Sequence, residues 1–210
     1  MYSSSMRYRV MTVSGSGEVT AEPDLASIQL GVVTEGQELT QLQQENARVM
    51  EQVIASVINL GIPRESLETV DYSIVPQYDY ESGTQVFRGY QITNMISIKT
   101  ENISQTGEVI DTAVDYGANQ IRDIHFSIEN SEAFYQQALA LALRDAYMKA
   151  ATMGRSMRLQ VDHAPLKVIE RSQHDPIPLA RAQTFAAATP IEPGELNIEA
   201  AVEVQFQFFA

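Results

Sequence analysis

The fold class is decided near the end of the chain by the stretch LNIEAAVEVQFQF, residues 196–208. Its even-numbered positions are apolar, whereas most of its odd-numbered positions carry Asn, Glu or Gln. Side chains alternate between the two faces of a β-strand, so this period of two predicts a long strand with one buried face. No other strand signal in the sequence is as clear.

Six further strands are predicted upstream. They cover about Tyr8–Val13, Leu25–Val33, Val70–Tyr80, Tyr90–Ile98, Ile124–Ile128 and Leu166–Arg171. The third and fourth form a hairpin with an exposed tip, because residues 79–84 have turn chemistry. Pro76 cannot donate to a ladder, which indicates an edge position or a bulge. Gly15-Ser16-Gly17 is interpreted as a glycine turn that joins the first two strands.

Three segments are predicted to be helical. They cover about Leu39–Leu60, Gly107–Tyr116 and Ser131–Met157. The first has apolar residues at three-to-four spacing and a conventional stop at Gly61. The third is rich in alanine and methionine, and Ser131 is its candidate N-cap. Its small side chains allow close approach of whatever packs on it.

The resulting order, β-β-α-β-β-α-β-α-β-β, predicts an α+β fold. We expect a mostly antiparallel sheet packed by one long helix and one or two further helices. The inner β-α-β-β-α-β stretch has the order of a ferredoxin-like core. A chain of 210 residues is long enough for one domain, which we place at 8–210 with a flexible N-terminus at 1–7. Residues 172–195, rich in proline and alanine, are predicted to form an extended or mobile excursion.

The charge is acidic, with 14 Lys and Arg against 27 Asp and Glu and a net charge of -13. A general polyanion binder needs a basic surface, so we expect no nucleic-acid partner. Basic residues gather in one stretch after residue 143: Arg144, Lys149, Arg155, Arg158, Lys167, Arg171 and Arg181. Two interpretations stay open. These cations either favour a helix C-terminus, or they form a patch that complements an acidic face on another copy.

The sequence shows no pattern for catalysis, a cofactor or a metal. There is no cysteine, no P-loop, and Thr20 stands where a dinucleotide fingerprint needs its third glycine. His163 and His174 each lie beside an acid, but no helical two-histidine spacing supports a metal site. His125 is interpreted as a sheet-surface residue. We therefore expect a protein that is not an enzyme and that has no cofactor.

No run of about 18 apolar residues exists, so we expect no membrane span. The first residues lack the apolar core of a secretory signal, which predicts a cytoplasmic location for the sequence as written. The alternative is a periplasmic or exported protein whose signal was removed.

Aromatic and basic residues supply the candidate interface positions. The predicted hairpin carries a cluster of tyrosines with one phenylalanine, which either packs in the core near the base or makes contacts at a protruding tip. Phe209 points away from the apolar face of the last strand and needs a cover. The candidate interface residues are Tyr80, Phe87, Arg155, Arg158, Phe185 and Phe209.

Several short motifs in order resemble the SIMPL domain family. They are Val13–Val19 with Pro23-Asp24, Gly61-Ile62 before Leu67–Thr69, Arg88–Tyr90, Gly117–Ile121, the alanine-rich residues 138–151, and Pro190–Gly194. The resemblance spans about residues 10–208. It implies likeness to bacterial periplasmic immunogenic proteins and to exported proteins linked to oxidative-stress tolerance. It also implies large, ring-like homo-oligomers in some members, and it supplies no catalytic residues.

Two functions follow as hypotheses. The first is a non-enzymatic, self-assembling scaffold or binding protein, with itself or another protein as partner. The second is a small-molecule-binding protein, or an enzyme of unrecognised type, with a pocket between the sheet and the long helix.

Overall fold

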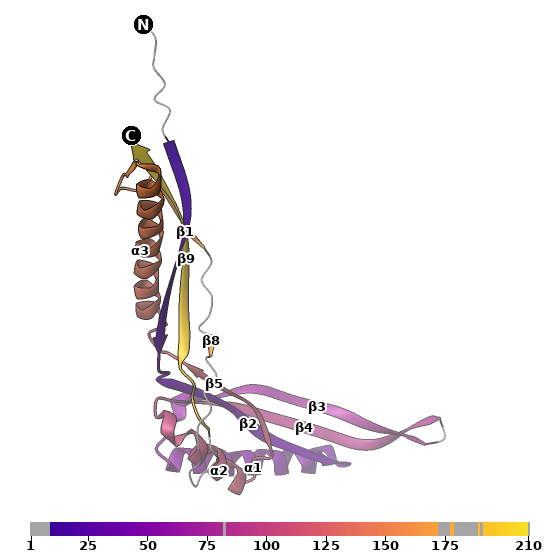
Figure 1. The fold of residues 1–210 in the computed structure, drawn as a ribbon. Coiled ribbons are helices and arrows are strands. Elements are labelled where there is room, and N and C mark those ends of the chain that lie inside the picture. The colour runs from indigo at the N-terminus through magenta and orange to yellow at the C-terminus, as the bar shows by residue number, and fades with distance from the viewer. Residues whose placement is uncertain (1–8, 82, 172–176, 179–188, 190, 210) are drawn as a thin grey trace. The chain divides into compact units, whose positions relative to one another are not determined.

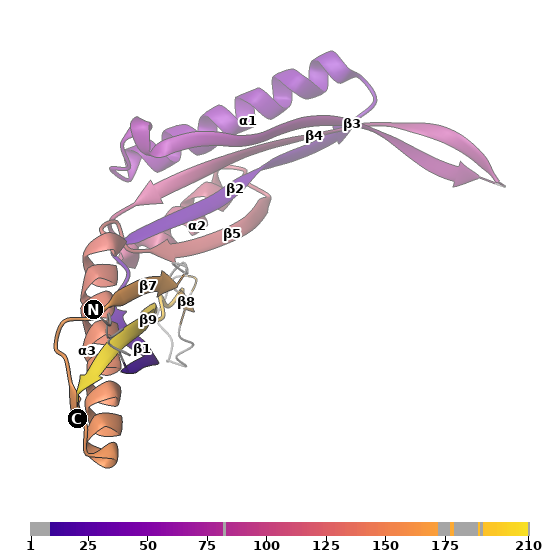
Figure 2. The same ribbon diagram turned by 90° about the horizontal axis from the view of Figure 1, so that it is seen from above.

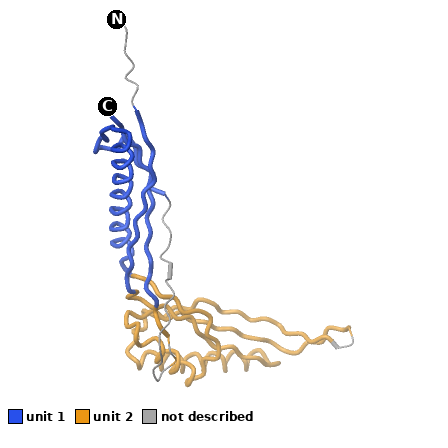
Figure 3. Tube along the Cα trace, in the orientation of Figure 1, with its two compact units in different colours: residues 1–22, 129–181, 194–210 blue, residues 23–128, 182–193 orange. Residues whose placement is uncertain are grey.

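The computed structural model describes residues 9–81, 83–171, 177–178, 189 and 191–209 (Figure 1). By its contacts the chain divides into two compact units, coloured separately in Figure 3. Unit 1 combines residues 1–22, 129–181 and 194–210, and unit 2 combines residues 23–128 and 182–193. The predicted α+β class is confirmed, and the predicted element order matches closely. One domain over 8–210 stays a prediction, and the predicted flexible residues 1–7 lie outside the described residues.

Unit 2 is an antiparallel sheet with two helices. Its strands are β2 (Leu25–Gly36), β3 (Leu67–Glu81), β4 (Thr84–Thr100) and β5 (Gln120–Ser127), in the spatial order β3-β4-β2-β5. The helices are α1 (Leu39–Asn59) and α2 (Thr106–Asp115), and short 3-10 turns lie at Arg64–Ser66 and Ile103–Gln105. The element order β-α-β-β-α-β and the all-antiparallel pairing agree with the ferredoxin-like core expected from the sequence.

The core of unit 2 lies between α1, α2 and one face of the sheet. Alternate residues of β2 supply Ile28, Leu30 and Val32, each at most 1% exposed. They pack with Val53 and Val57 of α1, which are fully buried. The apolar faces predicted from the period of two in β2 and from the helical spacing in α1 are therefore the faces that the structure buries.

A polar network crosses this core. Asn46 of α1 is 1% exposed, and its Nδ2 donates to the carbonyl of Val32 (3.1 Å) and to Thr34 Oγ1 (3.2 Å). Asn94 Nδ2 donates to Asn46 Oδ1 at 3.2 Å. Buried polar groups of this kind fix one arrangement of a helix on a sheet when each has a partner.

Replacing Asn46 by leucine is expected to lower the free energy of unfolding by about 1–3 kcal/mol, because Val32 and Asn94 lose their buried partner. Urea denaturation followed by circular dichroism measures the loss. The double variant Asn46→Leu/Asn94→Leu serves as the control, since it removes the orphaned amide and should recover part of the stability. If the free energy of unfolding of the double variant falls by the sum of the losses from the two single substitutions, the network is contradicted.

Unit 1 pairs the two ends of the chain. All 13 residues of β1 (Arg9–Ala21) pair antiparallel with β9 (Leu196–Phe209). Three short strands pair with β9 as well: β6 (Gln160–Val161), β7 (Lys167–Arg171) and β8 (Ile177–Pro178). The helix α3 (Ser131–Met157) packs on β1 and β9. The alternation in residues 196–208 is confirmed, since Val202, Val204 and Phe206 are at most 3% exposed.

The predicted turn at Gly15-Ser16-Gly17 is wrong, because both glycines lie inside β1. A Cβ on Gly15 would lie 2.0 Å from the carbonyl oxygen of Ala142, and one on Gly17 would lie 2.0 Å from that of Ala138. The facing side of α3 carries a fully buried stripe at four-residue spacing: Ala138, Ala142, Ala146 and Ala150. Glycine is therefore needed for close helix packing rather than for a turn.

The predicted cap of α3 is also one residue off. Asn130 is the N-cap, and its side chain accepts from the backbone N–H of Ala133 at 3.3 Å. Ser131 is instead the first helical residue. Asparagine and serine are comparable caps, so only the backbone geometry decides between neighbours.

Two side chains of α3 form hydrogen bonds with the backbone at the unpaired edge of β1. Among the described residues no strand pairs with this edge. The Ser16 backbone N–H donates to Asp145 Oδ2 (2.9 Å), and Lys149 Nζ donates to the Ser14 carbonyl (3.1 Å). Lys149 also donates to Asp145 Oδ2 at 2.6 Å. Unpaired edge groups invite pairing with another chain, and these two side chains occupy the middle of the edge.

Replacing Asp145 by alanine is expected to destabilise unit 1 by less than about 1 kcal/mol at neutral pH, since the ion pair is partly exposed. Hydrogen bonds from Lys149 and then from the Ser16 N–H hold the pKa of Asp145 below its ordinary value of 3.8. The stabilisation is therefore present above pH 3.8 and is lost as the pH falls through the lowered pKa. Urea midpoints of both proteins at pH 7 and in strong acid test this. A difference that persists unchanged in strong acid would contradict it.

Candidate protein-interaction site

The hairpin of β3 and β4 extends past the rest of its sheet as a two-stranded ribbon, which Figure 2 shows clearly. The pairing of β2 with β4 ends at Gly36 and Tyr90. Beyond that point β3 and β4 pair with each other as far as Glu81 and Thr84. We call residues 77–89 the arm. A two-stranded ribbon is only marginally stable alone in water, so an arm of this length favours a contact partner.

One face of the arm continues the core face of the sheet. The register pairs Ile74 with Ile92, then Pro76 with Tyr90, then Tyr78 with Phe87. A shift in register beside Tyr78 keeps these pairs on one side of the ribbon. The helix-covered apolar face therefore runs outward onto the arm, past the start of α1 at Leu39.

Aromatic rings line this face. The Phe87 ring packs edge-to-face on Tyr78, with centroids 5.7 Å apart, and on Tyr90, with centroids 5.1 Å apart. Nevertheless Tyr78 is 46% exposed, Phe87 44% and Tyr80 77%. The rings order one another but leave much of their apolar surface in water, which is typical of an interface anchor.

The base of the arm is fixed by polar contacts and a glycine. Arg88 forms an ion pair with Glu35, and Gln91 Nε2 donates to Glu35 Oε1 at 2.9 Å. Gly89 has φ +153°, and a Cβ there would lie 2.7 Å from the carbonyl oxygen of Gly36. The arm thus leaves the sheet in a defined direction.

The structure places Tyr80 and Phe87 on the arm and leaves both exposed, so of the two interpretations of the aromatic cluster the protruding tip agrees with their position. Their role as interface residues stays a prediction. Arg155, Arg158 and Phe209 lie in unit 1 instead. Arg155 is in the last turn of α3 and Arg158 is its C-cap with φ 56°, which agrees with the helix C-terminus interpretation. Phe209 pairs with Gln160 and is 47% exposed. Phe185 lies outside the described residues, as does most of the 172–195 excursion.

The histidines form no ligand cluster in the part of the chain that the structure describes, where no three His, Asp or Glu side chains lie close enough to hold a metal. His125 is exposed on β5, as predicted. The His163 ring stacks on Tyr147 with centroids 4.9 Å apart, and its Nε2 lies 3.2 Å from the Tyr147 hydroxyl. His174 is not among the described residues.

One tyrosine has a strongly perturbed pKa. Tyr135 of α3 is 7% exposed, and its hydroxyl donates to Glu170 Oε1 at 2.7 Å. Burial, followed by the hydrogen bond to Glu170, raises the pKa of Tyr135 to about 12. The hydrogen bond links α3 to β7, and the raised pKa keeps the Tyr135 hydroxyl protonated well above neutral pH.

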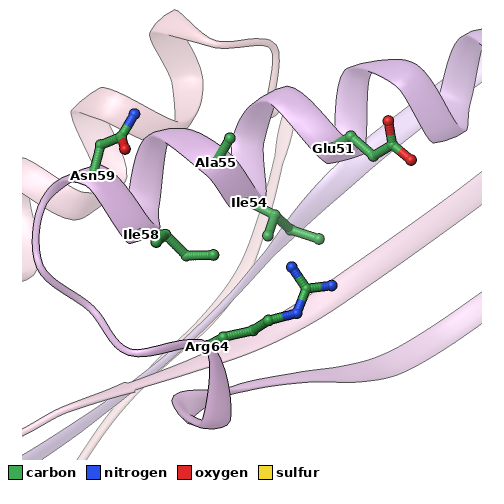
Figure 4. Close-up of a pocket in the computed structure, with 6 residues that line it drawn as sticks. All are labelled: Glu51, Ile54, Ala55, Ile58, Asn59 and Arg64. Atoms are coloured by element: carbon green, nitrogen blue, oxygen red, sulfur yellow. The ribbon is translucent and has the colours of Figure 1, made fainter.

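A pocket of about 390 Å³ opens between α1 and the turn before β3 (Figure 4). Ile54, Ala55 and Ile58 form its apolar part, and Asn59 lines it near the helix end. The Arg64 side chain extends toward Ile54 and Glu51 from the turn before β3, as Figure 4 shows. This pocket could not be predicted from the sequence, because its apolar residues belong to the same periodic pattern as the core positions of α1. Three-to-four spacing identifies the apolar side of a helix, but it does not show which of those residues are buried by the rest of the fold.

None of the helices within the described ranges has the length and apolarity to span a bilayer.

Comparisons with known proteins assign the chain to a family. Residues 11–206 match the model of the SIMPL family, described as proteins of unknown function (DUF541). The 26 kDa periplasmic immunogenic protein of Brucella melitensis is 26% identical, covering 94% of this chain and 84% of that protein. The uncharacterized protein YggE of Escherichia coli K12 is 22% identical, covering 94% of this chain and 80% of that protein. The resemblance found in the sequence is confirmed, and the chain belongs to the SIMPL family of proteins of unknown function.

Proposed function

We propose that this protein is a non-enzymatic scaffold or binding protein that assembles with copies of itself, with the arm as an assembly contact. The observation that carries the proposal is the aromatic face of the arm. It continues the apolar core face of unit 2 and remains about half exposed at Tyr78 and Phe87. Contiguous exposed apolar surface of this kind commonly marks a site that contacts a protein, a membrane or a ligand.

The size of the face suits a specific contact. An aromatic side chain buries roughly 150–250 Å² when it is fully covered. Tyr78 and Phe87 keep about half of this area in water and Tyr80 about three quarters, so the three rings supply part of the roughly 800 Å² per partner that a standard interface buries.

The alternative of a small-molecule pocket between a sheet and the long helix has less support. Gly15 and Gly17 let α3 approach β1 so closely that even a single added carbon has no room. The pocket on α1 is open and offers Glu51 and Arg64 as its charged groups. A site built for a small ligand is usually more enclosed, with several convergent polar groups.

We favour the periplasmic alternative over the cytoplasm, because the Brucella relatives matched over 94% of this chain are named as periplasmic proteins. The cytoplasmic prediction finds no support in these relatives. A role in oxidative stress stays a prediction.

Light scattering on a sizing column, at several protein concentrations and at low and high salt, tests the assembly. A discrete mass of several chains is expected. It should persist in high salt, because aromatic burial is less sensitive to screening than ion pairs are. A single-chain mass at every concentration would overturn the proposal of self-assembly.

A further inference from the structure

The two faces of the arm differ in charge. The aromatic face, from the base of the arm to its tip, presents three cross-strand pairs without a charged side chain: Pro76 with Tyr90, Tyr78 with Phe87, and Tyr80 with Gln85. Asp79 alternates with the tyrosines of β3 and so lies on the opposite face. There Asp79 and Glu35 form ion pairs with Arg88. These three charged groups are therefore directed away from the aromatic face.

The lack of charge on the aromatic face favours a second copy of the chain as its partner. The net charge is -13, so copies repel one another wherever their acidic surfaces meet. Two aromatic faces approach without bringing carboxylates together. We infer that this face packs against the same face of a second copy, with the two arms antiparallel across a twofold axis. The inference rests on the proposed self-assembly and specifies its contact.

Two arms match each other in length and width because they are identical. A two-stranded ribbon is only marginally stable alone, and a second ribbon packed face to face with it, about 10 Å away, supplies the missing layer. We place the axis at the pair of Tyr78 with Phe87, the middle of the three pairs. The Tyr80 pair at one tip then lies over the Tyr90 pair at the base of the other arm. Rings meet rings along the whole contact, in a setting where edge-to-face packing adds to the burial of area.

The exposed area of the face gives the strength of the contact. Tyr78 is 46% exposed, Phe87 44% and Tyr80 77%. At roughly 150–250 Å² per ring, these fractions leave roughly 250–420 Å² of ring surface on each arm. Pairing two arms doubles this area, which corresponds to the low end of interface sizes, where association is weak and reversible. We therefore expect the arm pair to separate on dilution.

A contact of this kind also restricts the number of chains. The same surface is used on both sides, so the contact is closed and each chain has one arm partner. An assembly in which every arm is paired therefore contains an even number of chains.

Opposite charges at Phe87 test the twofold axis, because a residue beside the axis faces its own copy. Phe87→Lys alone and Phe87→Glu alone bring like charges together, so each should raise the dissociation constant of the assembly at least tenfold. An equal mixture of the two variants brings opposite charges together. Its dissociation constant should be at least threefold lower than that of either variant, and native mass spectrometry should find both variants in equal numbers in each assembly.

The matched control uses Val114, which is 47% exposed on α2. Val114→Lys, Val114→Glu and their mixture should all assemble like the wild type. A Phe87 mixture that is as dissociated as each variant alone would overturn the arm-to-arm contact, because an arm that docks on a different surface gains nothing from mixing. Either Phe87 variant assembling like the wild type would overturn it too.

Spin labels on the opposite face measure the geometry without entering the contact. Because the chain has no cysteine, Val86→Cys carries a single label one residue from Phe87 on β4. In the antiparallel pair the two Val86 Cα atoms lie about 12 Å apart, from the strand rise and the spacing of packed sheets. Lys99→Cys is the control, because it lies 12 residues from Phe87 on the same strand. Its two Cα atoms lie about 80 Å apart.

The outcomes separate the contact from the self-assembly. In an assembled protein, a shortest distance at position 86 above about 40 Å, or equal distances at positions 86 and 99, would overturn the arm pair alone. A wild-type protein that is a single chain at all concentrations would overturn the self-assembly as well.

Discussion

Replacing Gly15 by alanine is expected to destabilise unit 1 by at least about 3 kcal/mol, although the change adds a single carbon. That carbon would lie 2.0 Å from the Ala142 carbonyl oxygen and 2.8 Å from Ala146 Cβ. Both are parts of a rigid helix, so α3 would have to move away from β1 and β9 along its length. Overpacking of well-packed cores costs about 1–3 kcal/mol, and a clash with backbone lies at the upper end or beyond.

Whether Gly15→Ala lowers or raises the free energy of unfolding shows whether α3 packs closely on β1. Gly15 has no positive φ, so alanine fits its backbone. Without the clash, the substitution would stabilise by about 0.4–1 kcal/mol through the unfolded state. Urea denaturation followed by circular dichroism measures the change. Ser16→Ala is the control on the opposite face of the same strand, and it should change the midpoint little. A more stable Gly15→Ala protein would contradict the close packing of α3 on β1.

Replacing both Tyr78 and Phe87 by serine is expected to convert the assembled protein into single chains. The two rings form an edge-to-face pair at the middle of the arm, and each is about half exposed in one chain. Their removal takes away both the apolar contact surface and the packing that orders the arm. We expect the dissociation constant of the assembly to rise at least 100-fold, which corresponds to about 2.7 kcal/mol.

Light scattering measures this change, and circular dichroism checks that the fold is retained. The matched control is Val114→Ser/Tyr116→Ser, which removes a 47%-exposed valine and a 55%-exposed tyrosine at the end of α2. Because both double variants lose exposed apolar surface, only a specific role of the arm separates them. An unchanged mass for Tyr78→Ser/Phe87→Ser would show that the assembly does not use the arm.

Much of the secondary structure could be predicted because its signals are local. The alternation in residues 196–208 predicted β9, and the stop at Gly61 agrees with the end of α1 at Asn59. Gly61 has φ +93°, the left-handed conformation that glycine favours after a helix. The hairpin turn was equally readable, since Gly83 has φ +84° between β3 and β4. In each of these cases the residues next to one another in the sequence are enough to explain the local structure.

The sequence-based predictions were wrong where the local structure depends on residues that are distant in the sequence. Gly15 and Gly17 look like a turn in isolation, and only the alanines of α3 that face them, more than 120 residues later, explain them as positions of close packing. Likewise the sequence could propose Tyr80 and Phe87 as contacts but could not decide whether they were covered. That depended on where β2 ends and α1 begins relative to the hairpin.

The sequence by itself thus determined the three helices and most of the strands, their order, the buried side of the clearest of them and the family. The tertiary structure decided which strands pair, that the two chain ends form one sheet, that the arm stands clear of α1, and that α1 carries a pocket. The division has a physical cause. Periodicity, caps and turns act over a few residues, whereas register, close packing and exposure are set by contacts between residues that are distant in sequence.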